Sequence, residues 1–132
     1  MLQKLSEIIS RFVPDPLAGK ERLLRELRPE ERIEVETVRQ LLDISSSTAR
    51  AICETAVRQG YFKRQVELLC PEGVAETDDG EHLIAETEDE LPEIVNCIEL
   101  EDGQYERKKV PKKHLKPHVF YKLHERAASV HA

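Results

Sequence analysis

Residues 35–69, VETVRQLLDISSSTARAICETAVRQGYFKRQVELL, carry the pattern from which the fold follows. Apolar residues at helical spacing predict a short helix over about 36–42 and a longer helix over about 46–59. Only Asp43-Ile44-Ser45 separates them, and Gly60 follows the second helix, where a left-handed residue often ends a helix. The residues after Gly60 favour a strand. This order of helix, tight turn, helix and strand predicts a helix-turn-helix motif with a wing.

The same stretch resembles the winged helix-turn-helix domain of bacterial regulators, whose motif runs LLGIS, then TA, then Gly before a hairpin wing. This chain has LLDIS at 41–45 and TA at 48–49, and the likeness covers about residues 16–70. The resemblance implies that the second helix of the motif enters the major groove of DNA and that the wing contacts backbone or minor groove. Carried over, it implies base contacts by Ser46, Ser47, Thr48 and Arg50, and phosphate contacts by Arg58, Lys63 and Arg64.

The charges of this helix leave a second interpretation open. Arg50 and Arg58 stand four residues on either side of Glu54, a spacing that predicts an ion-pair ladder on a solvated face. The alternative is that this face contacts a protein. Affinity for DNA depends largely on the number of phosphates neutralised. With four cations a monomer would bind DNA weakly, and a dimer would double the number of cations that contact phosphates.

The N-terminal segments read as helices. Residues 2–13 predict an amphipathic helix that Pro14 ends, and Asp15-Pro16 starts a second helix that runs to about Arg28. A very short strand is expected at 33–35. We treat 1–15 as an N-terminal helix preceding a domain over 16–70. A homodimer would form through the apolar face of the first helix, which carries Leu2, Leu5, Ile8 and Phe12.

The C-terminal half has the periodicity of short strands. Asp79-Gly80 separates residues 74–77 from 82–86, and Asp102-Gly103 separates 94–100 from 104–110, so each dipeptide predicts a hairpin. A final strand over 118–123 places Tyr121 on its apolar side and Phe120 on its polar side. We therefore predict an α+β protein: a winged helix-turn-helix with an N-terminal helix, a small C-terminal antiparallel β unit over 71–126 with an acidic loop, and a frayed tail at 127–132.

The formal net charge of −6 is unevenly distributed. Residues 67–106 hold 15 Asp and Glu and no Lys or Arg, whereas residues 107–126 hold eight Lys and Arg and one acid, Glu125. One interpretation is that strands from the two blocks lie side by side and neutralise each other. The other is that the acidic segment 72–93 and the basic strip 107–122 are docking surfaces for a partner.

Three cysteines, Cys53, Cys70 and Cys97, cannot all pair, so the sequence favours free thiols, a reducing compartment and a cytoplasmic location. Cys70-Pro71-Glu72-Gly73 resembles one knuckle of a zinc ribbon whose second Cys is missing, and Cys97 lacks a partner in the same way. A structural zinc needs four ligands. Cys70 and Cys97 would need one or two of His82, His114 and His118 beside them as ligands. We favour a ribbon-like unit without metal, with Cys70 and Cys97 as small buried apolar residues.

Several function classes lack support in this sequence. It contains no apolar run of the roughly 18–20 residues that span a membrane and no signal-peptide pattern at its start. It has no Gly-rich phosphate loop, no GxSxG elbow and no HExxH pair, so we expect no enzyme and no cofactor. Two functions remain: a DNA-binding transcriptional regulator, whose partner is double-stranded DNA, and a protein-interaction adaptor in a multi-component bacterial assembly.

Overall fold

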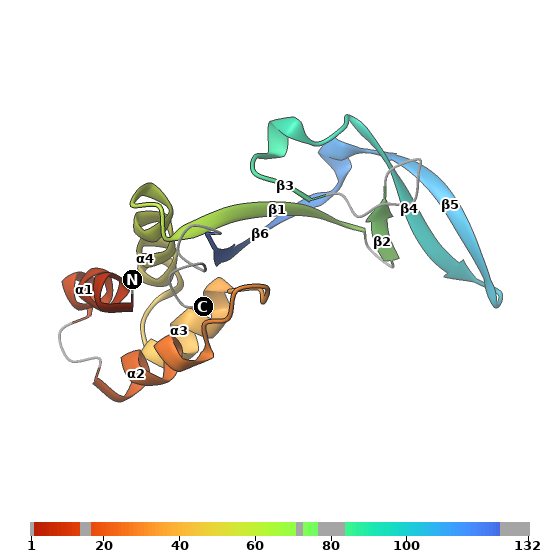
Figure 1. Ribbon diagram of the computed structural model, residues 1–132. Helices are drawn as coiled ribbons and strands as arrows, with labels where there is room; N and C mark the ends of the chain where they lie inside the picture. Colours follow the sequence, from red (N-terminus) through yellow and green to blue (C-terminus); the bar gives the residue numbers. More distant parts are fainter. Residues whose placement is uncertain (1, 14–16, 71–72, 77–83, 125–132) are drawn as a thin grey trace. The chain divides into compact units, whose positions relative to one another are not determined.

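The computed structural model describes residues 2–13, 17–70, 73–76 and 84–124 (Figure 1). The fold is α+β, and its contacts divide the chain into two compact units. Unit 2 is Gln65–Val119, and unit 1 contains the described residues up to Arg64 and from Phe120 onward. Two strands, β1 (Phe62–Cys70) and β6 (Lys116–Leu123), therefore run from one unit into the other.

Unit 1 is built from four helices whose apolar faces are buried among themselves. Helix α4 packs against both α1 and α3, and α2 packs against α3. The largest fully buried side chains here include Ile8, Val38, Cys53, Phe120 and Tyr121. The helices are α1 (Leu2–Phe12), α2 (Leu17–Glu26), α3 (Val35–Leu42) and α4 (Ser46–Arg58).

The turn between α3 and α4 follows from its local chemistry. Asp43 takes a left-handed conformation with φ 53°, which Asp tolerates better than most residues. Ser45 is the N-cap of α4, and its hydroxyl accepts a hydrogen bond from the backbone N–H of Thr48 at 3.2 Å. Gly60 follows α4 with φ +82°. The helices predicted over about 36–42 and 46–59 are confirmed to within one residue at each end.

The apolar face of α1 is used inside the chain. Leu5 and Ile8, which the sequence predicts at a dimer contact, are buried in the core of unit 1, and α1 packs against α4 and α2. Phe12 is exposed at the end of the helix, and the side chain of Leu2 lies outside the described residues. The predicted homodimer through this face is therefore wrong for Leu5 and Ile8, because an amphipathic stripe does not reveal whether its partner is another helix of the same chain.

Unit 2 is a twisted antiparallel sheet with strand order β3-β1-β2-β4-β5, and β6 pairs with β1. Two short 3-10 helices, η1 (Glu88–Glu90) and η2 (Lys112–His114), lie between strands. The remaining strands are β2 (Gly73–Glu76), β3 (Ile84–Ala85), β4 (Ile94–Glu101) and β5 (Gln104–Pro111).

One of the two predicted hairpins is confirmed. Strands β4 and β5 pair around Asp102-Gly103, whose φ angles of 52° and 80° suit a tight hairpin turn. The hairpin predicted between 74–77 and 82–86 is wrong, because β2 and β3 both pair with β1, through Leu69↔Val74 and Glu67↔Ile84. In the strand order β1 lies between β3 and β2, so the two short strands are not neighbours. Asp79-Gly80 lies outside the described residues.

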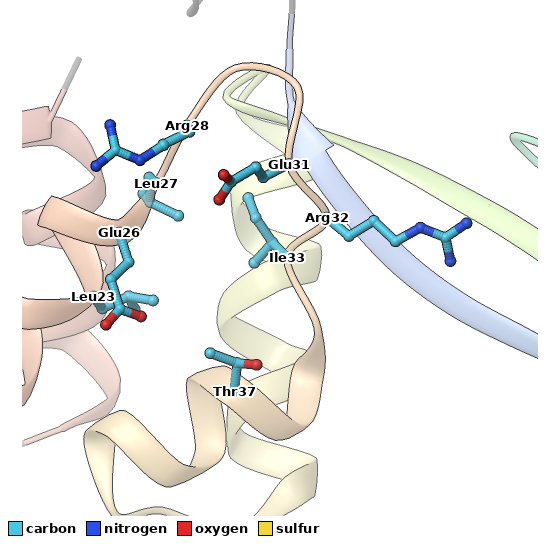
Figure 2. Close-up of a pocket in the computed structure, with 8 residues that line it drawn as sticks. All are labelled: Leu23, Glu26, Leu27, Arg28, Glu31, Arg32, Ile33 and Thr37. Atoms are coloured by element: carbon cyan, nitrogen blue, oxygen red, sulfur yellow. The ribbon is translucent and has the colours of Figure 1, made fainter.

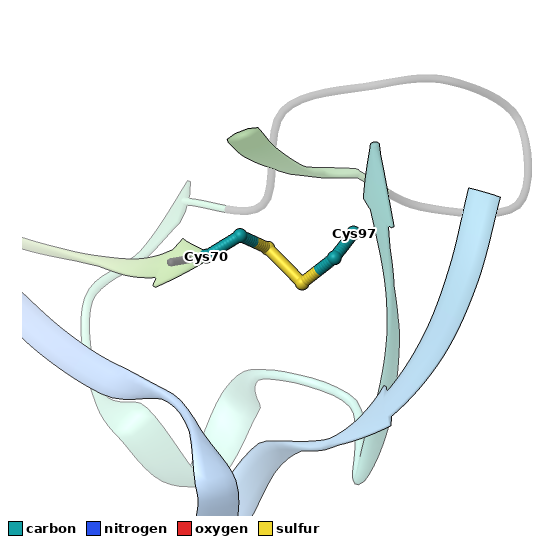
Figure 3. The surroundings of a disulfide bond; sticks show 2 residues. All are labelled: Cys70 and Cys97. Carbon is teal, nitrogen blue, oxygen red and sulfur yellow. A yellow bond between two sulfur atoms is a disulfide. The ribbon is translucent and has the colours of Figure 1, made fainter. Parts of the chain in front are cut away.

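Cys70 and Cys97 form a disulfide between β1 and β4, the two strands that flank β2 (Figure 3). The prediction of free thiols at these positions is therefore wrong, and disulfide sulfurs offer no thiolate to zinc. An odd number of cysteines excludes complete pairing but not a single bridge. Cys53 is the remaining thiol among the described residues, and it is buried in unit 1.

Candidate nucleic-acid interface

Helix α4 presents one buried face and one exposed polar face. Ala49, Ile52, Cys53 and Ala56 are buried on the side that packs against the other helices. The exposed positions on the rest of α4 belong to small hydroxyl side chains at its start and to two arginines. They are Ser46, Ser47, Arg50 and Arg58, with Thr48 half-buried beside them.

The first turn of α4 uses some of its hydroxyl groups internally. The Ser45 hydroxyl donates a hydrogen bond to Thr48 Oγ1 at 2.9 Å and lies 3.1 Å from the Ser47 hydroxyl. Ser46 is exposed, and its side chain makes no hydrogen bond to another described residue. Of the serines expected to contact bases, Ser46 is therefore the one whose hydroxyl is not engaged in the cap.

Arg64 is part of a cluster that joins α4 to the strands of unit 1. Its guanidinium donates to both carboxylate oxygens of Glu54, with Nε–Oε2 at 3.0 Å, and the Tyr121 hydroxyl donates to Glu54 Oε2 at 3.1 Å. The hydrogen bonds that it donates to Glu54 raise the pKa of the Arg64 guanidinium. Burial, together with the Glu54 charge, raises the pKa of the Tyr121 hydroxyl. A phosphate contact by Arg64 would have to compete with this bidentate ion pair.

Glu54 therefore does not form the ladder with Arg50 and Arg58 that is one interpretation of the sequence. The Arg58 guanidinium instead donates to Thr55 Oγ1 at 3.0 Å. Arg50 is exposed and has no ion pair with another described residue. Lys63, on β1, is half-buried. Within the described chain, Arg50 and Arg58 are thus the cations that α4 presents to solvent.

A pocket of about 300 Å³ lies between α2 and the segment that leads into α3 (Figure 2). Its wall mixes both charges with aliphatic groups, and the residues that line it include no nucleophile with an adjacent base. Arg32 extends from this segment over the ring of Phe120, 4.1 Å from the ring centroid. The lining residues are Leu23, Glu26, Leu27, Arg28, Glu31, Arg32, Ile33 and Thr37.

Strand β4 of the acidic block pairs with β5, but the register places no acid directly opposite Arg107, Lys108 or Lys109, so the pairing does not produce the expected row of cross-strand ion pairs. Lys112 is the clearest point of neutralisation: its side chain is only 11% exposed and lies 3.5 Å from the Glu93 carboxylate. Its ammonium also donates to the carbonyl oxygens of Glu88 and Leu91, each at 3.1 Å. Lys112 thus holds η1 in place, a structural role that its position in a charge run does not indicate.

No helix among the described residues is both long and apolar enough to cross a membrane. The same residues contain no group of three or more His, Cys, Asp or Glu side chains placed to hold a metal ion. Comparisons with protein-family models, with curated proteins and with solved structures give no match to this chain.

Proposed function

We propose that unit 1 is a winged helix-turn-helix domain and that the protein is a non-enzymatic DNA-binding regulator that contacts double-stranded DNA through α4. The observation that carries this proposal is the division of α4 into a buried apolar face and an exposed face with Ser46, Ser47 and Arg50 in its first turns. Short hydroxyl side chains and an arginine near the start of the second helix are suited to contact base edges and phosphates in a major groove.

The strands of unit 1 support the same interpretation. Ile33, just before α3, forms a bridge to Tyr121 of β6, with N–O distances of 2.6 and 2.9 Å. Strand β6 in turn pairs with β1, which follows α4. A small sheet thus accompanies the helix pair, and β1 and β6 would be the two strands of the wing. Unit 2 then occupies the connection between them, where a simple wing has only a turn.

The small number of cations sets the expected strength of binding. Arg50 and Arg58 would neutralise about two phosphates, and Lys63, which already has a partner in the chain, would add a third only by giving up that partner. Each phosphate contact adds roughly 0.9 to the slope of log K against log salt. We therefore expect weak binding by a single chain, with an affinity in the range of non-specific complexes, a Kd of about 10⁻⁴–10⁻⁶ M.

Fluorescence anisotropy of the full chain with a short random-sequence duplex tests this proposal. Between about 50 mM and about 200 mM salt, binding should weaken with a slope near −2 to −3, and Arg50→Gln should reduce that slope by about 0.9. The matched control is Arg22→Gln, which removes the same charge from an arginine paired with Glu26 on α2. Absence of binding at low salt, or equal losses in the two variants, would contradict the proposal.

A further inference from the structure

The sheet of unit 2 has two faces of different character. Directly opposed residues of antiparallel strands point to the same face, so the register assigns the positions of β1 to β5 to one face or the other. One face carries Val66, Leu68, Cys70, Val95 and Cys97, and Leu91 and Leu115 pack against it to form the core of the unit. The other face, called here the open face, carries Leu69, Ile84, Ile94, Ile98, Tyr105, Arg107 and Lys109, and also Asn96, which is buried.

The open face holds most of the exposed apolar surface of the described chain. Tyr105 is 78% exposed, Ile94 60%, Leu69 44% and Ile84 37%. Only Phe12, in unit 1, is a further large apolar residue that is exposed among the described residues. Ile84 on β3 and Tyr105 on β5 stand at opposite ends of the strand order, so these side chains are spread over the face, and among them only Tyr105 lies on β5.

Two cations border this surface on β5, the last strand in the sheet order. Arg107 lies opposite Ile98 and Lys109 lies opposite Asn96, so neither has an acid as its direct cross-strand partner. Both are exposed, and neither forms an ion pair with another described residue. Tyr105, Arg107 and Lys109 follow one another at every second residue, which spaces them by about 6.6–6.8 Å along one face.

We propose that the edge of β5 and the open face bind an extended acidic segment of a partner protein, which adds to the sheet as a further strand. Main-chain hydrogen bonds to a sheet edge give such a complex its affinity, and alternate side chains give it its specificity. In an antiparallel arrangement, the partner places acids opposite Lys109 and Arg107 and an apolar residue opposite Tyr105. Its sequence then reads acid, any residue, acid, any residue, apolar.

Two alternative roles for these side chains lead to different experimental outcomes. Lys and Arg on an edge strand can serve only to prevent unwanted pairing, in which case their removal promotes self-association and no peptide binds. Two cations and a tyrosine can also hold a single-stranded nucleic acid by charge and stacking. The position of these side chains on β5, the last strand in the sheet order, favours a protein segment, because an added strand can also pair with the main chain of β5.

The test is an NMR titration of the ¹⁵N-labelled full chain with the capped peptide Thr-Glu-Thr-Glu-Thr-Leu-Thr. We expect amide shifts to concentrate in β5, and weaker binding when the glutamates of the peptide are replaced by glutamine. The variant Arg107→Gln with Lys109→Gln should lose up to about 5-fold in affinity for each ion pair removed. The matched control, Lys113→Gln with Lys116→Gln, removes two exposed cations of the same basic stretch outside β5 and should bind like the wild type.

The proposal is overturned if the peptide gives no shifts in β5, or if the β5 variant and its control bind equally. Shifts in β5 with oligothymidylate but not with the peptide would assign the surface to nucleic acid instead. Self-association of the β5 variant without peptide binding by the wild type would identify an edge-protecting role. Duplex DNA should shift amides of α4, so this test and that of the DNA-binding proposal can fail separately.

Discussion

Unit 1 and unit 2 bury their apolar residues in different ways. In unit 1 each helix contributes to one shared core, and the charged pair Glu54–Arg64 ties α4 to the strands. In unit 2 the apolar core lies on one face of the sheet, a disulfide joins β1 to β4, and the other face keeps large apolar side chains in solvent. The stability of unit 1 therefore rests on helix packing, whereas unit 2 relies on a covalent link and leaves a face free for binding.

The strongest effect should fall on unit 2, through its disulfide. Cys70 and Cys97 are 27 residues apart, and closing a loop of that length stabilises a fold by about 3.5 kcal/mol through loss of chain entropy in the unfolded state. Reduction, or the double variant Cys70→Ala with Cys97→Ala, should therefore accelerate hydrogen exchange throughout unit 2. The protection of α4 in unit 1 should change little; an equal loss in both units would remove the distinction between them.

The next effect is on unit 1, at the contact between α2 and α3. A Cβ on Gly19 would fall inside van der Waals contact with the backbone carbonyl of Leu41, which cannot rotate away. Gly19→Ala should lower the free energy of unfolding by about 1–3 kcal/mol, the usual cost of overpacking. In an unobstructed helix the same change stabilises by up to about 1 kcal/mol, so a gain in the urea midpoint would contradict this packing.

Alkaline pH should also weaken unit 1 selectively. Burial raises the pKa of the Cys53 thiol to about 12, and burial beside Glu54 raises the pKa of the Tyr121 hydroxyl. Raised values mean that the neutral forms are favoured in the folded state. The contribution of these two groups to the free energy of unfolding is complete below their unfolded-state pKa values of about 8.5 and 10. It is lost as the pH rises toward their pKa values in the folded state.

Urea unfolding monitored between about pH 8 and about pH 11 measures this loss. Tyr121→Phe should flatten the alkaline part of the profile, although it also removes the hydrogen bond to Glu54. Tyr105→Phe is the matched control, because Tyr105 is exposed on unit 2. Identical profiles for the two variants would show that the Tyr121 hydroxyl does not titrate as described.

The weakest effect concerns the β4–β5 turn. Gly103 has φ +80°, so Gly103→Ala should destabilise unit 2 by about 1 kcal/mol. Asp102 also has a positive φ, of 52°, and Asp102→Gly should be neutral or slightly stabilising. The midpoints of thermal unfolding of the two variants are compared with that of the wild type. A lower midpoint for both would indicate that the Asp102 side chain itself stabilises the turn.

Local features of the fold could be predicted from the sequence. The helices α3 and α4, the end at Gly60 and the hairpin at Asp102-Gly103 depend on the conformational preferences of residues close together in the sequence. The same holds for the division of α4 into a buried apolar face and the exposed face that carries the proposed site.

Features that depend on distant residues could not be predicted. Periodicity identifies β2 and β3 as strands, but their shared partner β1 is set by the tertiary fold. Alternation assigns Phe120 to the polar side of its strand, yet it is fully buried beneath Arg32, a residue 88 positions away. The engagement of Arg64 by Glu54 likewise links α4 to β1, so a count of cations near α4 overstates those that are available.

The proposal that DNA contacts lie on α4 of unit 1 can be decided by the salt dependence of duplex binding. Two variants of equal charge are compared by anisotropy: Arg50→Gln with Arg58→Gln on α4, and Arg107→Gln with Lys109→Gln on β5. We predict that the α4 variant lowers the slope of log K against log salt by about 1.8, at roughly 0.9 per phosphate contact, while the β5 variant keeps the wild-type slope. A reduced slope in the β5 variant with an unchanged slope in the α4 variant would contradict this assignment.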